Sequence, residues 1–408
     1  MKKSLVALAA FAAVGAFAQS TVTLSGNIKA GVAHTKYSGG PIATTNGNGL
    51  SLADGSSRFI IGGTEDLGGG LKAVFQIDTR FRADDNGGAT TGALATAPAA
   101  TIATASPLAG GNTFVGLSGG FGLVQLGKLD THYCLGSDQH GSRATALQAS
   151  SCAILGFVNG ATPGTAIANA SRSQNIIRYT TPNFSGFQAQ ANYSTAWQGP
   201  EGVQNTIAAP GNAAGVGDAG KGRAMALGLN YGKGPLKAGV SFWDAKSEDR
   251  RAGSVRADQR AGTAFIDWNF GVATVGLTYD QSQLAPRNAL GVDSEVKRRA
   301  WSIPVTVPMG AGTFLVTYTK ARDLTGTTAG TGITAAVPVA ADTGATLISV
   351  GYDYALSKRT SLGVSYAKLN NKANGGYALY TQGALNGTPN NAAGQDASQL
   401  YLGVRHAF

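Results

Sequence analysis

The stretch Tyr401-Leu-Gly-Val-Arg-His-Ala-Phe408 ends the chain, and it decides the fold. Alternate side chains of an extended strand point to opposite faces. One face of this strand therefore carries Leu402, Val404, His406 and the terminal Phe408. A soluble sheet would leave such an aromatic end frayed in water. A transmembrane β-barrel uses its last strand to close the cylinder and needs one lipid-facing side on it, so the stretch predicts a membrane barrel.

The amino end predicts export from the cytoplasm. Two lysines precede an apolar run at residues 5–17, and Ala16-Phe17-Ala18 has the small-residue pattern of a signal-peptidase site. The run is shorter than the ~20 apolar residues that a membrane-spanning helix needs. We therefore expect a signal peptide at residues 1–18 and one β-barrel domain at residues 19–408.

The composition suits a membrane barrel better than a soluble enzyme. Glycine accounts for 59 of 408 residues and charged residues for 13%, whereas about a quarter of the residues of an ordinary globular domain are charged. Hydrophobic residues make up 43% of the chain without another long apolar run, so alternation has to supply the lipid-facing surface. The basic residues stand singly rather than in clusters with aromatics, and we therefore expect no nucleic acid partner.

Alternation continues through most of the sequence. Apolar residues recur at every second position in segments such as 227–231, 275–279 and 314–318, and tyrosines recur near the segment ends. Tight connections rich in Gly, Pro and Asn alternate with long connections rich in Gly, Ala and Thr. This pattern is typical of an outer-membrane barrel with short periplasmic turns and long external loops, and it predicts about 16 antiparallel strands. A soluble all-β sandwich would also alternate, but it would not combine a signal peptide, a terminal Phe strand and outward tyrosines at so many strand ends.

Five stretches resemble one known family. They are Thr21-Val-Thr-Leu-Ser-Gly26, Ser57-Arg-Phe-Ile-Ile-Gly-Gly-Thr-Glu-Asp-Leu-Gly-Gly-Gly-Leu-Lys-Ala-Val-Phe-Gln76, Ile177-Arg-Tyr-Thr-Thr-Pro-Asn-Phe-Ser-Gly-Phe187, Leu356-Ser-Lys-Arg-Thr360 and Leu402-Gly-Val-Arg-His-Ala-Phe408. In sequence and order they resemble the Gram-negative outer-membrane general porins of the beta-proteobacterial type. The resemblance implies a homotrimer of antiparallel β-barrels, each with its third external loop folded into the lumen. Here that loop corresponds to about residues 129–171.

The resemblance also implies a function. Porins of this type let ions and small hydrophilic solutes diffuse passively through a water-filled pore, so we expect neither enzymatic activity nor a cofactor. Their partners are outer-membrane lipid, lipopolysaccharide and the barrel assembly machinery, which reads a terminal Phe, here Phe408. Two other classes are an outer-membrane adhesin or structural barrel, and an outer-membrane enzyme. The enzyme would need a Ser/His/acid set, which the 4 histidines of the chain do not suggest.

Strand parity places several charged side chains in the lumen. If Phe59 faces lipid, Arg58 faces the pore, and the same argument turns Lys72 and Arg178 inward. Arg172 shares the parity of Arg178 if the strand reaches that far. A charge on the lipid side of the midplane costs ~2–4 kcal/mol, which favours the inward positions. The same parity places further residues inside: Lys29, Gln76, Asp78, Gln125, Lys237, Arg298 and Arg405.

The resemblance gives two of these residues a role. Arg58 and Arg172 correspond to wall arginines that face the constriction loop in anion-preferring members of the family, whereas Gly110-Gly-Asn112 lacks a third basic residue. A wall rich in Arg and Lys attracts anions, so we expect a preference for small anions. Asp130 and Asp138 fall in the predicted constriction loop, where either could oppose the arginines across the pore.

Cys134 and Cys152 both fall in the predicted loop. In an oxidising compartment an isolated pair of cysteines is most simply a disulfide, which would stiffen the loop. Free thiols and a metal site with His132 and His140 are the alternatives, although the spacing matches no standard zinc pattern. We favour the disulfide and expect no bound metal.

Overall fold

The structure is a computed structural model of the whole chain. It describes residues 20–40, 46–55, 57–81, 83, 108–131, 139–155, 157–158, 167–168, 172–195, 222–246, 256–288, 290–328, 334–380 and 392–408. The signal peptide expected at residues 1–18 lies outside the described residues and stays a prediction. No helix in the described part of the chain is long and apolar enough to span a bilayer.

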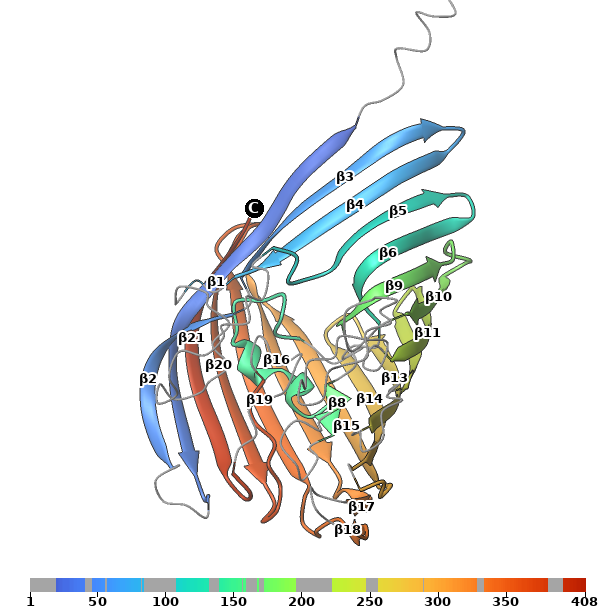
Figure 1. Ribbon diagram of the computed structural model, residues 1–408. Coiled ribbons are helices and arrows are strands. Elements are labelled where there is room, and N and C mark those ends of the chain that lie inside the picture. Colours follow the sequence, from blue (N-terminus) through green and yellow to red (C-terminus); the bar gives the residue numbers. More distant parts are fainter. Residues whose placement is uncertain are drawn as a thin grey trace, which may run out of the picture.

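The chain folds into a closed antiparallel β-barrel of 16 strands (Figure 1). Neighbouring strands pair in chain order, and the last strand, β21 (Asp396–Ala407), pairs with the first, β1 (Thr21–Ser38). β2 (Gly47–Asp54) and β3 (Arg58–Gly68) together form the second barrel strand, because both pair with β1 in succession. The predicted all-β transmembrane barrel is confirmed.

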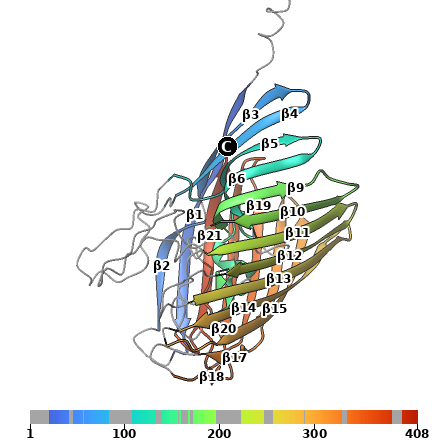
Figure 2. The same cartoon turned by 45° about the vertical axis from the view of Figure 1, so that its right-hand side comes forward.

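The other barrel strands follow in sequence, and in Figure 2 those from β9 to β14 run obliquely across the wall. They are β4 (Leu71–Arg80), β5 (Thr113–Gly119), β6 (Gly122–Asp130), β9 (Arg172–Thr180), β10 (Phe187–Ser194), β11 (Arg223–Lys233), β12 (Leu236–Lys246), β13 (Arg256–Asn269), β14 (Thr274–Arg287), β15 (Glu295–Met309), β16 (Gly312–Ala321), β19 (Ala345–Ala355) and β20 (Thr360–Asn371). Four short strands belong to the connections: β7 (Phe157–Val158), β8 (Ile167–Ala168), β17 (Thr325–Thr328) and β18 (Val337–Pro338). Such oblique strands are what barrel closure requires.

The two faces of the wall differ as the alternation predicts. On β11, Leu227 and Leu229 are exposed while Ala226 is buried, and on β21, Leu402 is exposed while Tyr401 is buried. Aromatic residues are exposed on many strands: Tyr179, Tyr193, Trp268, Tyr279, Tyr354 and Tyr366. The outer surface is therefore apolar with interspersed aromatics, as a lipid-facing surface requires.

The seam between β1 and β21 closes the barrel. Gly26 and Phe408 exchange two backbone hydrogen bonds of 3.1 Å each, and Phe408 remains partly exposed. β21 pairs with residues 27–38 of β1, so the pairing ends next to Gly26. On its other edge, β1 pairs with β3 through residues 21–27.

Deleting Phe408 should lower the yield of assembled barrels. The deletion removes both hydrogen bonds to Gly26, each worth ~0.5–1.5 kcal/mol, at the place where the ladder closes. The fraction of heat-modifiable barrels in isolated outer membranes measures the effect, and barrels that do assemble should conduct nearly as the wild type does. Phe184→Ala, which changes an exposed aromatic away from the seam, is the control. Equal yields for the deletion and the control would contradict the prediction.

Candidate functional site at the pore constriction

Residues 139–155, the longest described part of the predicted third loop, lie inside the barrel against the inner wall (Figure 1). They include two short 3-10 helices, η2 (Leu147–Ala149) and η3 (Ser151–Ala153). Their apolar side chains form one buried cluster with inward residues of β15, β16, β19 and β20, among them Leu347 and Leu369. The loop therefore fills part of the lumen on that side.

A buried arginine on the wall holds the loop. The side chain of Arg298 on β15 is fully buried, and its Nη1 donates to the carbonyl of Ile154 in the loop. Its Nη2 donates to Asp280 on β14 and to Ser282 Oγ, the latter at 3.0 Å. Thr263 Oγ1 donates to the other oxygen of Asp280 at 2.7 Å, so the carboxylate is also held from β13. The inward position predicted for Arg298 is confirmed. Its guanidinium group binds the loop and Asp280 and is not exposed to the pore.

A second buried basic residue, on the seam strand β1, also holds the loop. Lys29 on β1 is fully buried, and its Nζ donates to the carbonyl of His140 at 3.0 Å. The His140 ring is also buried, with Nδ1 2.9 Å from Thr145 Oγ1. On β20, a Cβ added to Gly363 would overlap the backbone of Ala144, so the loop backbone lies directly on the strand there. The start and the end of this segment are thus fixed by different strands.

The cysteine and acidic residues predicted for the loop divide into described and undescribed positions. Cys152 belongs to η3, is fully buried in the cluster and is bonded in a disulfide. Cys134 and Asp138 lie outside the described residues, so the Cys134–Cys152 pairing and the role of Asp138 stay predictions. His132 lies outside them too, whereas His140 serves the loop packing described above.

Asp130 does not belong to the loop, and that expectation was wrong. It is the last residue of β6 and therefore part of the wall. Asn112, just before β5, is joined to Asp130 by two hydrogen bonds. Its Nδ2 donates to Asp130 Oδ2 at 3.1 Å, and its Oδ1 accepts from the Asp130 backbone N–H at 2.8 Å. The carbonyl of Asp130 accepts from Arg178 Nη2. Asp130 thus lies beside an arginine of the wall instead of opposing it across the pore.

Two arginines of the wall share one carboxylate. Arg58 on β3 and Arg80 on β4 are direct register partners. Asp78 Oδ2 lies 3.0 Å from Arg80 Nη2 and 3.9 Å from Arg58 Nη1. The carboxylate is 2% exposed, whereas the arginine side chains are 36% and 22% exposed. Within the described residues, two partly exposed guanidinium groups thus share one buried carboxylate, and the exposed part of this group consists of arginine side chains.

Sequence reasoning did not single out Arg80, although it placed Asp78 in the lumen. Arg80 has the same parity as Asp78 on the same strand, and that signal would have found it. Lys72, which sequence reasoning did single out, is the register partner of Asp66, next to the short turn at the other end of the β3–β4 hairpin. Arg58 and Asp66 are eight positions apart on β3, which corresponds to about 27 Å. Lys72 is therefore remote from the arginines.

Of the two candidate arginines on β9, only Arg178 has a described side chain. Arg178 is partly buried, and its Nε donates to Asn192 Oδ1 on β10 at 2.5 Å. Arg172 occupies the register position opposite Asp130, but its side chain lies outside the described residues. The register of β9 shifts by one residue between them, and Asn175 there has φ of 55°. Parity therefore does not carry from Arg178 to Arg172, and this part of the sequence argument was wrong.

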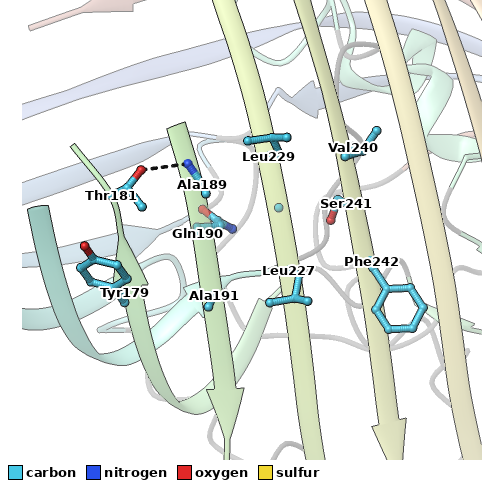
Figure 3. A pocket seen from close by; sticks show the side chains of 11 residues that line it. Tyr179, Thr181, Ala189, Gln190, Ala191, Leu227, Leu229, Val240, Ser241 and Phe242 are labelled. Atoms are coloured by element: carbon cyan, nitrogen blue, oxygen red, sulfur yellow. Dashed lines mark hydrogen bonds between the residues drawn. The ribbon is translucent and has the colours of Figure 1, made fainter. Parts of the chain in front are cut away.

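The described wall also has a groove on its outer side. It has a volume of about 390 Å³ and lies between β9 and β12 (Figure 3). Ala189 and Ala191 leave space there between Tyr179 and the outward leucines of β11. Because these residues belong to the apolar outer face, the groove faces the bilayer and is separate from the constriction.

At the external rim, a salt bridge joins the connection after β16 to the connection after β20. Asp323, after β16, lies 2.7 Å from Lys372 Nζ, after β20, and accepts from the backbone of Gly344 at 2.8 Å. Asp342 lies 3.7 Å from the same ammonium. The hydrogen bond from Lys372 lowers the pKa of Asp323, and the same bond raises the pKa of Lys372.

The variant Arg298→Met should loosen the constriction loop. It removes the donor to Ile154 and leaves Asp280 buried without its counter-charge, which typically costs ~3–5 kcal/mol. We expect larger open-channel noise and conductance in single-channel recordings. The double variant Arg298→Met/Asp280→Leu removes the uncompensated charge, so it should regain thermal stability and keep the noise. Wild-type noise in both variants would contradict an anchoring role.

The contact between Asp323 and Lys372 should open in acid. A carboxylate whose folded pKa is lowered stabilises the fold above its unfolded pKa of about 3.9, and this contribution is lost as the pH falls through the folded value. A lysine whose pKa is raised contributes fully below its unfolded pKa of about 10.4 and loses the contribution only at higher pH. We expect hydrogen-exchange protection of residues 323–328 and 372–380, corrected for intrinsic rates, to fall below about pH 4. In Asp323→Asn the protection should be lower at neutral pH and should change less with acid.

Comparisons with known proteins agree with the barrel. The chain matches the Gram-negative porin family over residues 4–374. It is 31% identical to outer membrane porin protein 32 of Delftia acidovorans over 418 aligned positions, with 100% of both chains covered. It is 27% identical to an outer membrane porin protein of Bordetella pertussis, covering 90% of this chain and 94% of that one.

A solved structure is similar as well. The anion-selective porin from Comamonas acidovorans superposes with a TM-score of 0.69 at 27% identity, covering 96% of this chain and 100% of that one. Sequence, fold and inner loop thus lead to one conclusion. The chain belongs to the Gram-negative porins, the β-barrel channels of the outer membrane.

Proposed function

We propose that this porin channel prefers anions and that the pair Arg58 and Arg80 sets the preference. The observation that carries the proposal is the sharing of one buried carboxylate, Asp78, by two partly exposed guanidinium groups. A positive wall beside a low-dielectric barrel attracts anions and repels cations. The similarity to a structure described as an anion-selective porin supports the same preference.

The position of the inner loop strengthens this effect. The loop packs on β15, β16, β19 and β20. Around the closed barrel, β3 and β4 follow beyond the seam strands β21 and β1, and β9 lies about halfway round from the loop. Passing ions are therefore confined toward the wall that carries Arg58, Arg80 and Arg178. The Debye length at physiological ionic strength is about 8 Å, so charges act on ions only when the passage is narrow. Arg172 remains a candidate for the same wall.

Neutralising the arginine pair should reduce anion preference. In bilayers under a salt gradient, we expect the reversal potential of Arg58→Gln/Arg80→Gln to shift strongly toward zero, because the accessible positive charge of the wall is removed. Lys72→Gln is the matched control, since it removes one lumen charge about 27 Å away and should cause a smaller shift. Asp78→Asn should shift the potential the other way, toward stronger anion preference.

Three outcomes would contradict the assignment. One is a wild type that prefers cations. Another is an unchanged reversal potential in the arginine variant. The third is an effect of Lys72→Gln as large as that of the double variant, since it would mean that net lumen charge matters and position does not. Variants of Arg172 and Arg178 then become the next to test.

We further propose the partners of the channel. The family resemblance supports a homotrimer that is inserted by the barrel assembly machinery through the terminal strand with Phe408. The apolar and aromatic outer surface supports contact with outer-membrane lipid and with lipopolysaccharide. Small anions and small hydrophilic solutes are the proposed cargo, and they diffuse without chemical change.

A further inference from the structure

Three basic residues lie close together on the outer wall near the external rim. We call Arg299 on β15, Lys320 on β16 and Arg322 immediately after β16 the outer basic cluster. All three side chains are exposed. The backbone N–H of Arg322 donates to the carbonyl of Arg299 at 2.8 Å, so the ladder continues one step beyond the pair Ala300 and Ala321. Arg299 and Arg322 therefore stand opposite each other.

Parity shows that the cluster faces away from the pore. Ala300 and Ala321, the neighbours of Arg299 and Arg322 in the chain, are buried on the lumen side. Lys320 is the register partner of Trp301, whose ring lies 5.2 Å from that of Tyr318. Side chains that alternate with inward residues must point to the outer surface.

No acidic side chain in the described part of the chain neutralises the like charges of the cluster. Like charges directly opposite on neighbouring strands destabilise a sheet. Arg299, Lys320 and Arg322 make no ion pair with any residue in the part of the chain that the structure describes. Asp323 is next in the sequence but is engaged by Lys372 at 2.7 Å. An external anion would remove this repulsion.

The neighbouring part of the same rim is different. On β12 and β13, Arg260 Nε lies 2.7 Å from Asp244, and Lys246 Nζ lies 3.3 Å from Asp258. On β15, Lys297 pairs with Glu295. Each of these three basic side chains has an acidic partner. The outer basic cluster differs from them in this respect.

The height of the cluster relative to the aromatic residues indicates its surroundings. Aromatic side chains on the outer face of a barrel lie at the membrane–water interface. Trp301 and Tyr318 form such a pair on β15 and β16. Arg299 and Lys320 are each two residues further toward the long external connections than one of these aromatics. In the outer membrane this is the level of the lipid headgroups in the external leaflet.

We propose that the outer basic cluster binds the phosphate of an anionic lipid headgroup in the external leaflet. Arginine forks match phosphate oxygens in pairs, and a lysine adds a third charge. Two facing arginines and one lysine thus offer a site for a single phosphate of a phosphorylated glycolipid. The inference rests on the proposed contact with lipopolysaccharide and assigns it a place on the wall.

The test is a titration of the purified full-length porin in detergent, read by native mass spectrometry. The probes are a bisphosphorylated lipid A, the same glycolipid without phosphates, and inorganic phosphate. The variant is R299Q/K320Q/R322Q. Its control, K233Q/K358Q/R359Q, removes the same number of exposed basic charges at the short turns of the opposite rim. Retained heat-modifiable migration shows that both variants fold, as expected for exposed side chains.

We expect the phosphorylated glycolipid to bind the wild type and the control alike. A basic residue near a lipid surface changes affinity by about fivefold, so the triple variant should bind at least tenfold more weakly. The glycolipid without phosphates should bind weakly to all three proteins, and inorganic phosphate should not displace the lipid. Equal binding by the triple variant, or an equal loss in the control, overturns the site but leaves the lipopolysaccharide contact standing. Absence of binding to the wild type overturns both.

Discussion

Every backbone polar group within the hydrocarbon of a membrane must find its partner inside the protein, and the rest of this structure depends on that constraint. The ladder satisfies it by closing β1 on β21, with Gly26 and Phe408 as the last pair. A Cβ at Gly26 would lie 2.8 Å from the ring of Phe408, so the seam combines a small residue with a large one. Once the ladder is closed, parity alone decides which side chains face lipid and which face the lumen.

Burial by the inner loop then decides what an inward charge does. Arg298 and Lys29 lie under the loop, lose their contact with water and donate to its carbonyl groups. A buried charge is tolerated only when it is paired and hydrogen-bonded, which Asp280 and Ser282 provide for Arg298. Arg58 and Arg80 lie beyond the loop and keep partial exposure. Arginine thus anchors the loop where the loop buries it and presents charge where its side chain stays partly exposed.

Parity explains which parts of the structure could be predicted. It correctly gave the barrel, the outward apolar rows and the inward position of Arg298, and it would also have given Arg80. It failed at Arg172, because the extra residue near Asn175 changes the register and local sequence did not signal it. It could not give the loop anchors, since Arg298 and Ile154 are 144 positions apart in the chain. Such contacts depend on how the loop folds back, which alternation does not encode.

The register of β15 decides which of two adjacent arginines faces the lumen and which faces the outer surface. Arg298 and Arg299 are adjacent, yet one is buried beneath the inner loop and the other is exposed on the outer wall. A one-residue slip would exchange them, because the side-chain period of a strand is two. Pro304 interrupts the hydrogen bonding of this strand, since it has no N–H. The register is nevertheless the same on both sides of Pro304, where Val275 pairs with Val305 and Thr278 with Ser302. A Cβ at Gly276 would lie 2.8 Å from the Pro304 ring, so glycine there accommodates the ring without a slip and keeps both arginines on their proper faces.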